Sequence, residues 1–148
     1  HDTENKYFVN VTTGGFGITI DGAFGDLRYL TGLLNSRLLD WLIKQVSTTF
    51  HGGYFAANKQ FLVQLPVRTI DFGNRQDRSK HDMIVELVEL MQSLHRELAA
   101  AKSEAQKAVT ERQLAATDRR IDHVVYNLYG LTEREIRIVE DATSRVAN

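Results

Sequence analysis

Two apolar seams in the second half of the chain constrain its fold more than any other feature. The first seam recurs at steps of three and four residues, the spacing of one helix face. Its members are Ile84, Leu87, Met91, Leu94, Leu98 and Ala101. The second seam repeats these steps through Leu114, Thr117, Ile121, Val124, Leu128 and Leu131. Two seams of similar length, joined by a short break, predict a long antiparallel, coiled-coil-like helical hairpin.

Capping signals mark where these helices begin and end. Ser103 and Gln106 have the spacing of a capping box at the start of the second helix, and Gly130 is placed to end it. Thr132 and Glu135 repeat the capping-box spacing, which predicts a last short helix near residues 133–143. We expect the two seams to bury each other, within one chain or across a dimer.

The first 72 residues carry strand-like and helix-like patterns. KYFVNV, TTGG and FGITID predict a β-hairpin over residues 6–21. Asp26 is a candidate N-cap for a helix over about 27–47, and its leucines recur on most faces, as in a buried helix. QFLVQLPV, residues 60–67, predicts a short apolar strand ending at Pro66, because proline cannot donate to a sheet.

The expected fold class is therefore α+β. Residues 1–72 would form a partial mixed α/β domain with the β-hairpin and the buried helix. Residues 73–148 would form the helical hairpin as a spacer, followed by the short C-terminal helix.

Composition excludes several classes of protein. The chain has no cysteine, which excludes disulfides, thiolate metal sites and a cysteine nucleophile, and suits a cytoplasmic protein. No apolar run approaches the roughly 20 residues of a membrane span, so no membrane partner is expected. The polar N-terminus, HDTENKYF, lacks a signal-peptide pattern and an initiator methionine. We therefore expect the chain to be an excised piece of a longer protein.

Charge is unevenly distributed along the chain. Net charge is −1, which does not demand an acidic polymer as partner. Within residues 27–70, however, five cations face one acid, Asp40, a local balance of +4 from five minus one. These cations are Arg28, Arg37, Lys44, Lys59 and Arg68. Residues 73–148 mix twelve basic with thirteen acidic side chains, which is typical of a solvated helix surface.

No convergent catalytic site emerges from the sequence. The five histidines lack the spacing of a zinc-binding helix. Glu4-Asn5-Lys6 has the Glu-x-Lys spacing of many metal-dependent nucleases, but only Asp2 at the terminus stands upstream as an acid. TGGFG, residues 13–17, is more typical of a hairpin turn than of a phosphate loop. Carboxylate pairs such as Asp118 and Asp122 have basic neighbours and are expected to form solvated ion pairs.

The order of segments resembles a known family. LRYLTGLLNSRLLDWLIKQ is followed by a glycine loop HGGYFAANKQ, then FLVQLPV, then the helical hairpin, and finally YNLYGLTEREIRIVE. This order is similar to the C-terminal, TaqI-methyltransferase-like specificity region of type IIG restriction-modification enzymes and related adenine-specific DNA methyltransferases. It also resembles the target recognition domains and coiled-coil spacers of type I specificity subunits. The resemblance covers roughly residues 24–140 and rests on segment order and spacing more than on any single motif.

The resemblance implies sequence-specific recognition of double-stranded DNA for adenine methylation, cleavage or both. It implies S-adenosylmethionine and Mg²⁺ as cofactors of the parent enzyme, and a methyltransferase domain of the same or another chain as partner. The family's methylation motif needs two adjacent prolines, and Pro66 is the only proline here. The region itself is therefore expected to be non-catalytic and to bind no cofactor.

The loop STTFHGGYFAANK carries the candidate DNA-binding residues implied by this resemblance. They are Thr48, Thr49, His51, Gly52, Gly53, Tyr54, Asn58 and Lys59. Glycines let a backbone approach phosphates, lysine displaces counterions, and the polar and aromatic side chains can contact phosphates or base edges. The alternative is a plain connector whose Tyr54 and Phe55 fold back into the core.

A second hypothesis makes the chain a protein–protein interaction module. The hairpin region is nearly neutral, so residues 73–148 could dock a partner or form a homodimer without touching DNA. The low net charge also predicts weak DNA binding by the isolated chain.

Overall fold

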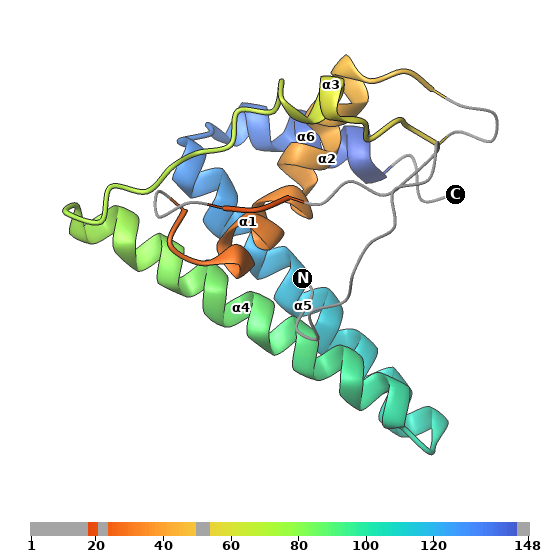
Figure 1. Ribbon diagram of the computed structural model, residues 1–148. Helices are drawn as coiled ribbons and strands as arrows, with labels where there is room; N and C mark the ends of the chain where they lie inside the picture. The colour runs from red at the N-terminus through yellow and green to blue at the C-terminus, as the bar shows by residue number, and fades with distance from the viewer. Residues whose placement is uncertain (1–17, 21–23, 50–53, 145–148) are drawn as a thin grey trace.

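The computed structural model describes residues 18–20, 24–49 and 54–144. The helices in these ranges are α1 (Leu27–Leu34), α2 (Arg37–Val46), α3 (Lys59–Leu62), α4 (Arg75–Ala100), α5 (Glu104–Tyr129) and α6 (Glu133–Ser144). α4 and α5 lie side by side as a long hairpin, and the shorter helices gather around the end away from its turn (Figure 1). The outer part of the hairpin projects beyond the other helices.

The helical hairpin and its caps are confirmed. Asn74 caps α4 by accepting hydrogen bonds from the Gln76 and Asp77 amides. Ser103 Oγ accepts from the Gln106 amide, while the Gln106 side chain accepts from the Lys102 amide. Gly130 ends α5 with a left-handed φ of 69°, a conformation that favours glycine because it has no Cβ.

The last short helix is confirmed as well. Thr132 and Glu135 form a reciprocal capping box before α6: each backbone amide donates to the other's side-chain oxygen. The two hydrogen bonds satisfy amides that the first turn of a helix leaves without partners.

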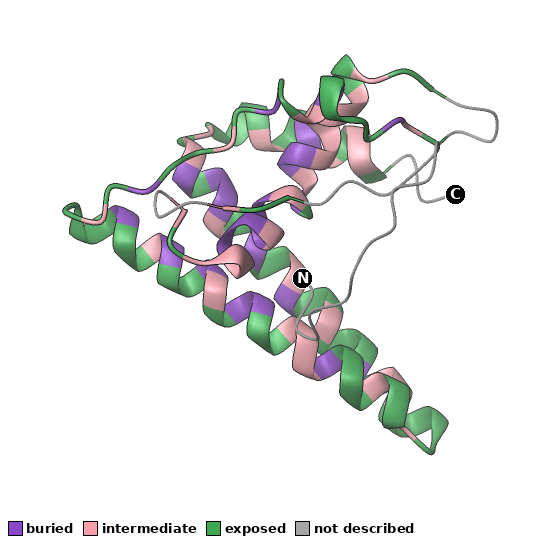
Figure 2. Cartoon of the chain, in the orientation of Figure 1, coloured by how far each residue is buried: buried purple, intermediate pink, exposed green. Residues whose placement is uncertain are grey.

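One hydrophobic core joins the hairpin to the shorter helices. Ile84, Leu87, Ile121, Val125 and Leu128 are buried within it, and Met91 and Val124 pack against it. The two seams therefore bury each other within one chain, as the sequence predicted. The same core contains residues of α1, α2 and α6, which are Tyr29, Leu33, Leu38, Leu39 and Val139. Buried residues concentrate where the short helices cover the hairpin, while the outer hairpin is largely exposed (Figure 2).

Gly32 sets the distance between α1 and α4. A Cβ at this position would lie 2.5 Å from Ile84 Cγ2 and 3.1 Å from Val88 Cγ2, closer than carbon atoms pack. The absent side chain therefore lets the α1 backbone rest directly on two branched side chains of α4.

The expected α+β fold class is wrong. The described residues are predominantly helical and contain no sheet. Their only strand-like pairing is an isolated antiparallel bridge between Thr49 and Phe55. Most of the expected β-hairpin, over residues 6–17 and 21, lies outside the described residues, and residues 18–20 of it form no strand. The partial mixed α/β domain is thereby replaced by helices that pack on the hairpin.

The predicted strand over residues 60–67 is also wrong. Residues 59–62 form α3, and hydrogen-bonded turns continue to Leu65. Phe61 and Leu65 are buried four residues apart, whereas Val63, which a strand would put on the same face, is 69% exposed. The apolar residues therefore follow a helical period instead of the two-residue period of a strand.

The predicted helix over residues 27–47 is two helices. Asp26 caps α1 as expected, by accepting from the Arg28 amide. Ser36 then adopts an extended backbone and starts α2, with its hydroxyl donating to Leu33 O and accepting from the Leu39 amide. Ser36 is 1% exposed, so this break is a buried, hydrogen-bonded joint between α1 and α2.

Arg68 fastens the segment before α4 to the end of α5. Its guanidinium pairs with Asp77 at 3.1 Å and donates to Leu128 O. The Tyr29 hydroxyl donates to Arg68 O at 2.9 Å, and the Tyr129 hydroxyl donates to Pro66 O at 2.7 Å. Residues 66–68 thus join α1, α4 and α5. They also hold the segment between α3 and α4 in place, and so position α3, which comes directly before that segment.

Candidate nucleic-acid interface

The base of the 48–59 loop is held by a short backbone clamp. Ser47 ends α2, and its hydroxyl donates to Ala56 O at 2.5 Å. The Ala56 amide donates to Thr48 O at 3.0 Å, next to the Thr49–Phe55 bridge. Ala56 is 3% exposed. These contacts bring the two ends of the loop together at the C-terminus of α2.

The predicted DNA-binding residues that the structure describes lie on the surface. Thr48 and Thr49 are exposed on one side of the clamp, and Tyr54 is 74% exposed on the other. Asn58 and Lys59 are exposed at the start of α3, where Asn58 is the N-cap residue without a side-chain capping bond. The remaining predicted residues, His51, Gly52 and Gly53, lie outside the described residues. Of the two residues that the connector hypothesis would fold into the core, Tyr54 is exposed and Phe55 is partly buried.

Phe55 is partly buried beneath a lysine. Lys44 Nζ lies 5.9 Å from the centre of the Phe55 ring and pairs with Asp40 Oδ2 at 2.6 Å. A cation within about 6 Å of an aromatic ring is attracted by the ring's electron density. This contact ties the loop to α2 through a side chain, in addition to the backbone clamp.

Most of the positive charge in residues 27–70 is neutralised by acids from other segments. Arg37 pairs with Asp122 and Arg68 with Asp77, while Lys44 pairs locally with Asp40. The remaining arginine, Arg28, pairs with Asp26 and Glu89. Among the five cations, only Lys59 has no ion pair within the described residues. The local balance of +4 therefore does not produce a continuous basic surface. Of the five cations, Lys59 is the one left to bind an anion beside the loop.

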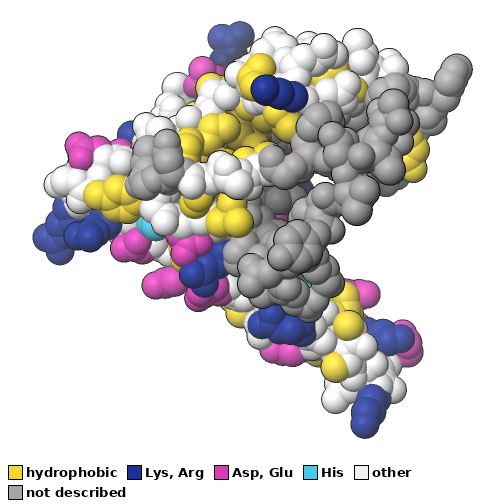
Figure 3. Space-filling model, in the orientation of Figure 1, with side chains coloured by type: hydrophobic (Ala, Val, Ile, Leu, Met, Phe, Trp, Pro, Cys, Tyr) yellow, Lys and Arg dark blue, Asp and Glu magenta, His cyan; other side chains and the backbone are white. Residues whose placement is uncertain are grey.

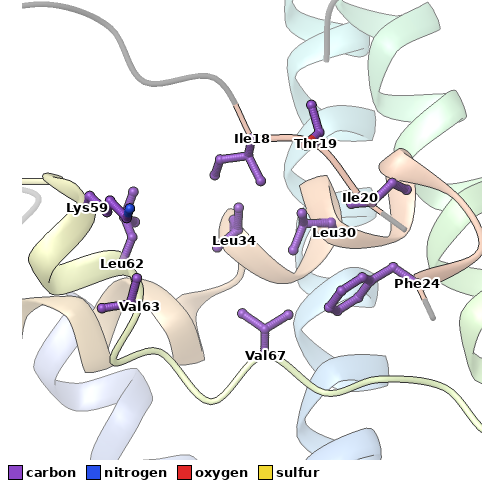
Figure 4. Close-up of a pocket in the computed structure, with 10 residues that line it drawn as sticks. All are labelled: Ile18, Thr19, Ile20, Phe24, Leu30, Leu34, Lys59, Leu62, Val63 and Val67. Atoms are coloured by element: carbon purple, nitrogen blue, oxygen red, sulfur yellow. The ribbon is translucent and has the colours of Figure 1, made fainter. Parts of the chain in front are cut away.

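Lys59 lies at the edge of an apolar groove of about 490 Å³ between α1 and α3. Figure 4 shows its side chain beside Leu62 and Val63, across from Leu34. Leu30, Phe24 and Val67 continue the wall. In the space-filling view, hydrophobic side chains gather on this face, whereas charges of both signs alternate along the hairpin (Figure 3).

A buried polar cluster on another face was missed in the sequence. Asp122 was expected to be a solvated helix carboxylate, yet it is 4% exposed and binds the N-terminus of α2. Its partner Arg37 lies 85 residues earlier, so no local spacing rule links the two. The one available signal was position: Asp122 follows Ile121 of the apolar seam and so lies at its border.

The described residues hold no group of three or more histidine, aspartate or glutamate side chains that could bind a metal ion. Among the same residues, none of the helices has both the length and the apolar character needed to span a bilayer.

Comparison with known proteins relates the chain to restriction-modification enzymes. No family model matches the chain, and no solved structure matches it. The chain is similar to the type II restriction enzyme and methyltransferase RM.Eco57I of Escherichia coli, with 23% identity over 163 aligned positions. The alignment covers 95% of this chain and 16% of that enzyme. The chain is thus related to one region of a restriction-modification enzyme and spans a small part of its length.

Proposed function

We propose that the chain is a non-catalytic region of a restriction-modification enzyme, and that it presents the 48–59 loop to double-stranded DNA. One observation carries this proposal: similarity to RM.Eco57I extends over 95% of the chain. The finer role is target recognition for adenine methylation, cleavage or both, in the manner of a TaqI-like specificity region. S-adenosylmethionine and Mg²⁺ would then bind elsewhere in the intact type IIG enzyme, which would act in the cytoplasm.

The geometry of the loop supports contact with DNA. The clamp at Ser47 and Ala56 fixes both ends of the loop, so that Tyr54 is held outward on a rigid base. Lys59 is exposed and has no ion pair within the described residues, so its ammonium is available to a phosphate. A lysine acts there as a point charge that adds affinity without reading sequence, whereas a tyrosine can stack on or hydrogen-bond to a base.

The absence of a methylation motif supports a non-catalytic role. The motif of adenine methyltransferases requires adjacent prolines, and the chain contains one proline. The division near residue 72 into a recognition part and a helical spacer stays a prediction about the intact enzyme. In this chain the two parts share a core, so truncation at residue 72 would expose Tyr29 and Leu33 instead of separating two functions.

Replacing Lys59 with alanine in the intact enzyme should weaken binding to all duplexes alike. The loss of one phosphate contact should also reduce the slope of log K against log salt concentration by roughly one unit. Titration of cognate and scrambled duplexes at several salt concentrations measures both effects. Lys102→Ala is the matched control, because Lys102 is an exposed lysine in the turn between α4 and α5, at the end of the hairpin away from the shorter helices (Figure 1).

Tyr54→Ala should instead reduce discrimination between cognate and mismatched duplexes, by about 1–3 kcal/mol if a base contact is lost. Its salt dependence should stay that of the parent, because tyrosine carries no charge to release counterions. Thermal unfolding of the variant should be unchanged, since Tyr54 is largely exposed. If Lys59→Ala and Tyr54→Ala both bind like the parent at every salt concentration, the loop is a connector.

A second candidate function is suggested by the outer hairpin. α4 and α5 extend beyond the shorter helices that pack on the hairpin (Figure 1). Val109 is 50% exposed near the start of α5, and Leu90 is 41% exposed near the middle of α4. Exposed apolar side chains on a projecting helix pair suit docking to a methyltransferase part or a second copy of the chain. Leu90→Glu and Val109→Glu should then weaken assembly, measured by sedimentation, and leave the salt slope of DNA binding unchanged. Unchanged sedimentation would exclude this surface as the interface.

A further inference from the structure

Three helices meet at one buried carboxylate. Asp122 of α5 accepts a hydrogen bond from the Arg37 amide at 2.8 Å through Oδ1. Arg37 is the first residue of α2, where the helix presents amides without intrahelical partners. Asp122 therefore connects α5 to the positive end of α2. Glu140 of α6 lines the same 280 Å³ pocket.

The second oxygen of this carboxylate is less well satisfied. Oδ2 lies 3.2 Å from Arg37 Nε, within ion-pair range, but the angles are not those of a hydrogen bond, and it accepts none in the described structure. The Tyr126 hydroxyl, one turn further along α5, is also buried and makes no hydrogen bond to any residue that the structure describes. A buried charge with an incomplete set of hydrogen bonds is costly.

Charged groups of both signs face Asp122 from the helices around it. α2 contributes Arg37, while α5 contributes Asp118, Arg119 and His123. α6 contributes Glu140 and Asp141. Of these, Asp118 and Glu140 oppose ionisation of Asp122, and Arg37 favours it.

Burial dominates this balance. Removal from water disfavours the ionised form and raises the pKa of Asp122 from 3.8 to about 6, against the lowering effect of the Arg37 amide. Asp118 and Glu140 add to the rise because like charges disfavour ionisation. The carboxyl therefore changes its charge close to neutral pH.

We propose that the Asp122 junction is a pH-sensitive latch, in which protonation of Asp122 tightens the docking of α6 against α2 and α5. A neutral Asp122 keeps the hydrogen bond from the Arg37 amide and no longer repels Glu140. The Arg37 guanidinium is then released from its ion pair with Asp122 and is free to pair with Glu140, which lines the same pocket. This pairing draws α6 toward α2. Ionisation reverses these changes.

The chain contains its own reporter of this latch. Trp41 is the only tryptophan in the sequence. It lies on α2 and lines a small apolar pocket with Ile138 and Val139 of α6. Any loosening of α6 from α2 should expose the Trp41 indole to water and to a soluble quencher.

Trp41 fluorescence and its quenching by acrylamide, followed from pH 4.5 to 8 in the 148-residue chain, should test the latch. We expect a single transition with its midpoint near pH 6, with stronger quenching on the alkaline side. Asp122→Asn keeps an acceptor for the Arg37 amide and should abolish the transition. Glu140→Gln removes both the like charge that opposes ionised Asp122 and the acid with which Arg37 would pair, so the transition should become much smaller, and any residual transition should lie at lower pH.

His123→Gln is the control for the neighbouring imidazole, which lines the same pocket as Asp122. His123 is exposed, and its replacement should leave the midpoint unchanged. A transition that persists in Asp122→Asn, or that disappears in His123→Gln, would overturn the proposal. Should Asp122→Asn fail to fold, a transition of unchanged size and midpoint in Glu140→Gln would overturn it equally.

Discussion

Replacing Ile121 with alanine is expected to lower the free energy of unfolding by about 2–4 kcal/mol. Ile121 is 6% exposed and lies in the core that joins α5 to α1 and α4. Its truncation removes apolar contacts and leaves a cavity that helices held on three sides cannot close. Equilibrium unfolding in urea, followed by circular dichroism, measures the change.

Two further variants make the test specific. Leu94→Ala should cost a similar amount, because Leu94 is 4% exposed on the facing helix α4. Val109→Ala removes a branched apolar side chain from α5 at a position that is 50% exposed, and should change stability by less than about 0.5 kcal/mol. If Ile121→Ala and Val109→Ala have the same free energy of unfolding, the packing of α5 has been misassigned.

Gly32→Val should destabilise the chain by about 2–3 kcal/mol through overpacking. Even the first added carbon would lie 2.5 Å from Ile84 Cγ2, a branched methyl that cannot swing away as the end of a flexible side chain could. α1 would then have to move away from α4 and loosen the core around Tyr29 and Leu33. Thermal or urea unfolding measures the loss.

The neighbouring substitution Thr31→Val is the matched control for Gly32→Val. It introduces the same branched residue into the same helix, at a position only partly buried, at the cost of one hydrogen bond to Leu27 O. Its effect should stay near 1 kcal/mol. Combining Gly32→Val with Ile84→Ala should cost less than the sum of the single changes, because the truncated side chain makes room for the new one. If the free-energy costs of the two single changes simply add in the double variant, the close approach of α1 to α4 is contradicted.

Local sequence rules were sufficient for the second half of the fold. The seams through Ile84 and Ile121 have a helical period over several turns, and the capping residues Ser103, Gly130 and Thr132 act on amides and carbonyls of their own turn. Such interactions join residues close in sequence, so their spacing is visible without a structure. The hairpin, its caps and the last short helix were therefore predictable.

The same rules failed where short apolar runs fit two patterns. FLVQL satisfies both the alternation of a strand and the four-residue step of a helix, and only its surroundings selected α3, with Phe61 and Leu65 buried and Val63 exposed. The helix predicted over 27–47 likewise broke at Ser36, whose burial at the joint depends on the packing of α1 and α2. The expectation of a mixed α/β domain could not reveal that residues 59–62 form a helix or that the helix breaks at Ser36.

For the candidate interface, the sequence by itself determined residue types, and the tertiary structure decided which charges are available. The cations of residues 27–70 give this stretch a local balance of +4 in the sequence. In the structure, however, Arg37 and Arg68 are paired with Asp122 and Asp77, which come from later in the chain. Coulomb attraction depends on distance in space and on burial, neither of which is encoded in local spacing. The sequence thus specified the helices through interactions a few residues apart. Folding alone decided that Lys59 has no ion pair among the described residues and that Asp122 is buried among three helices.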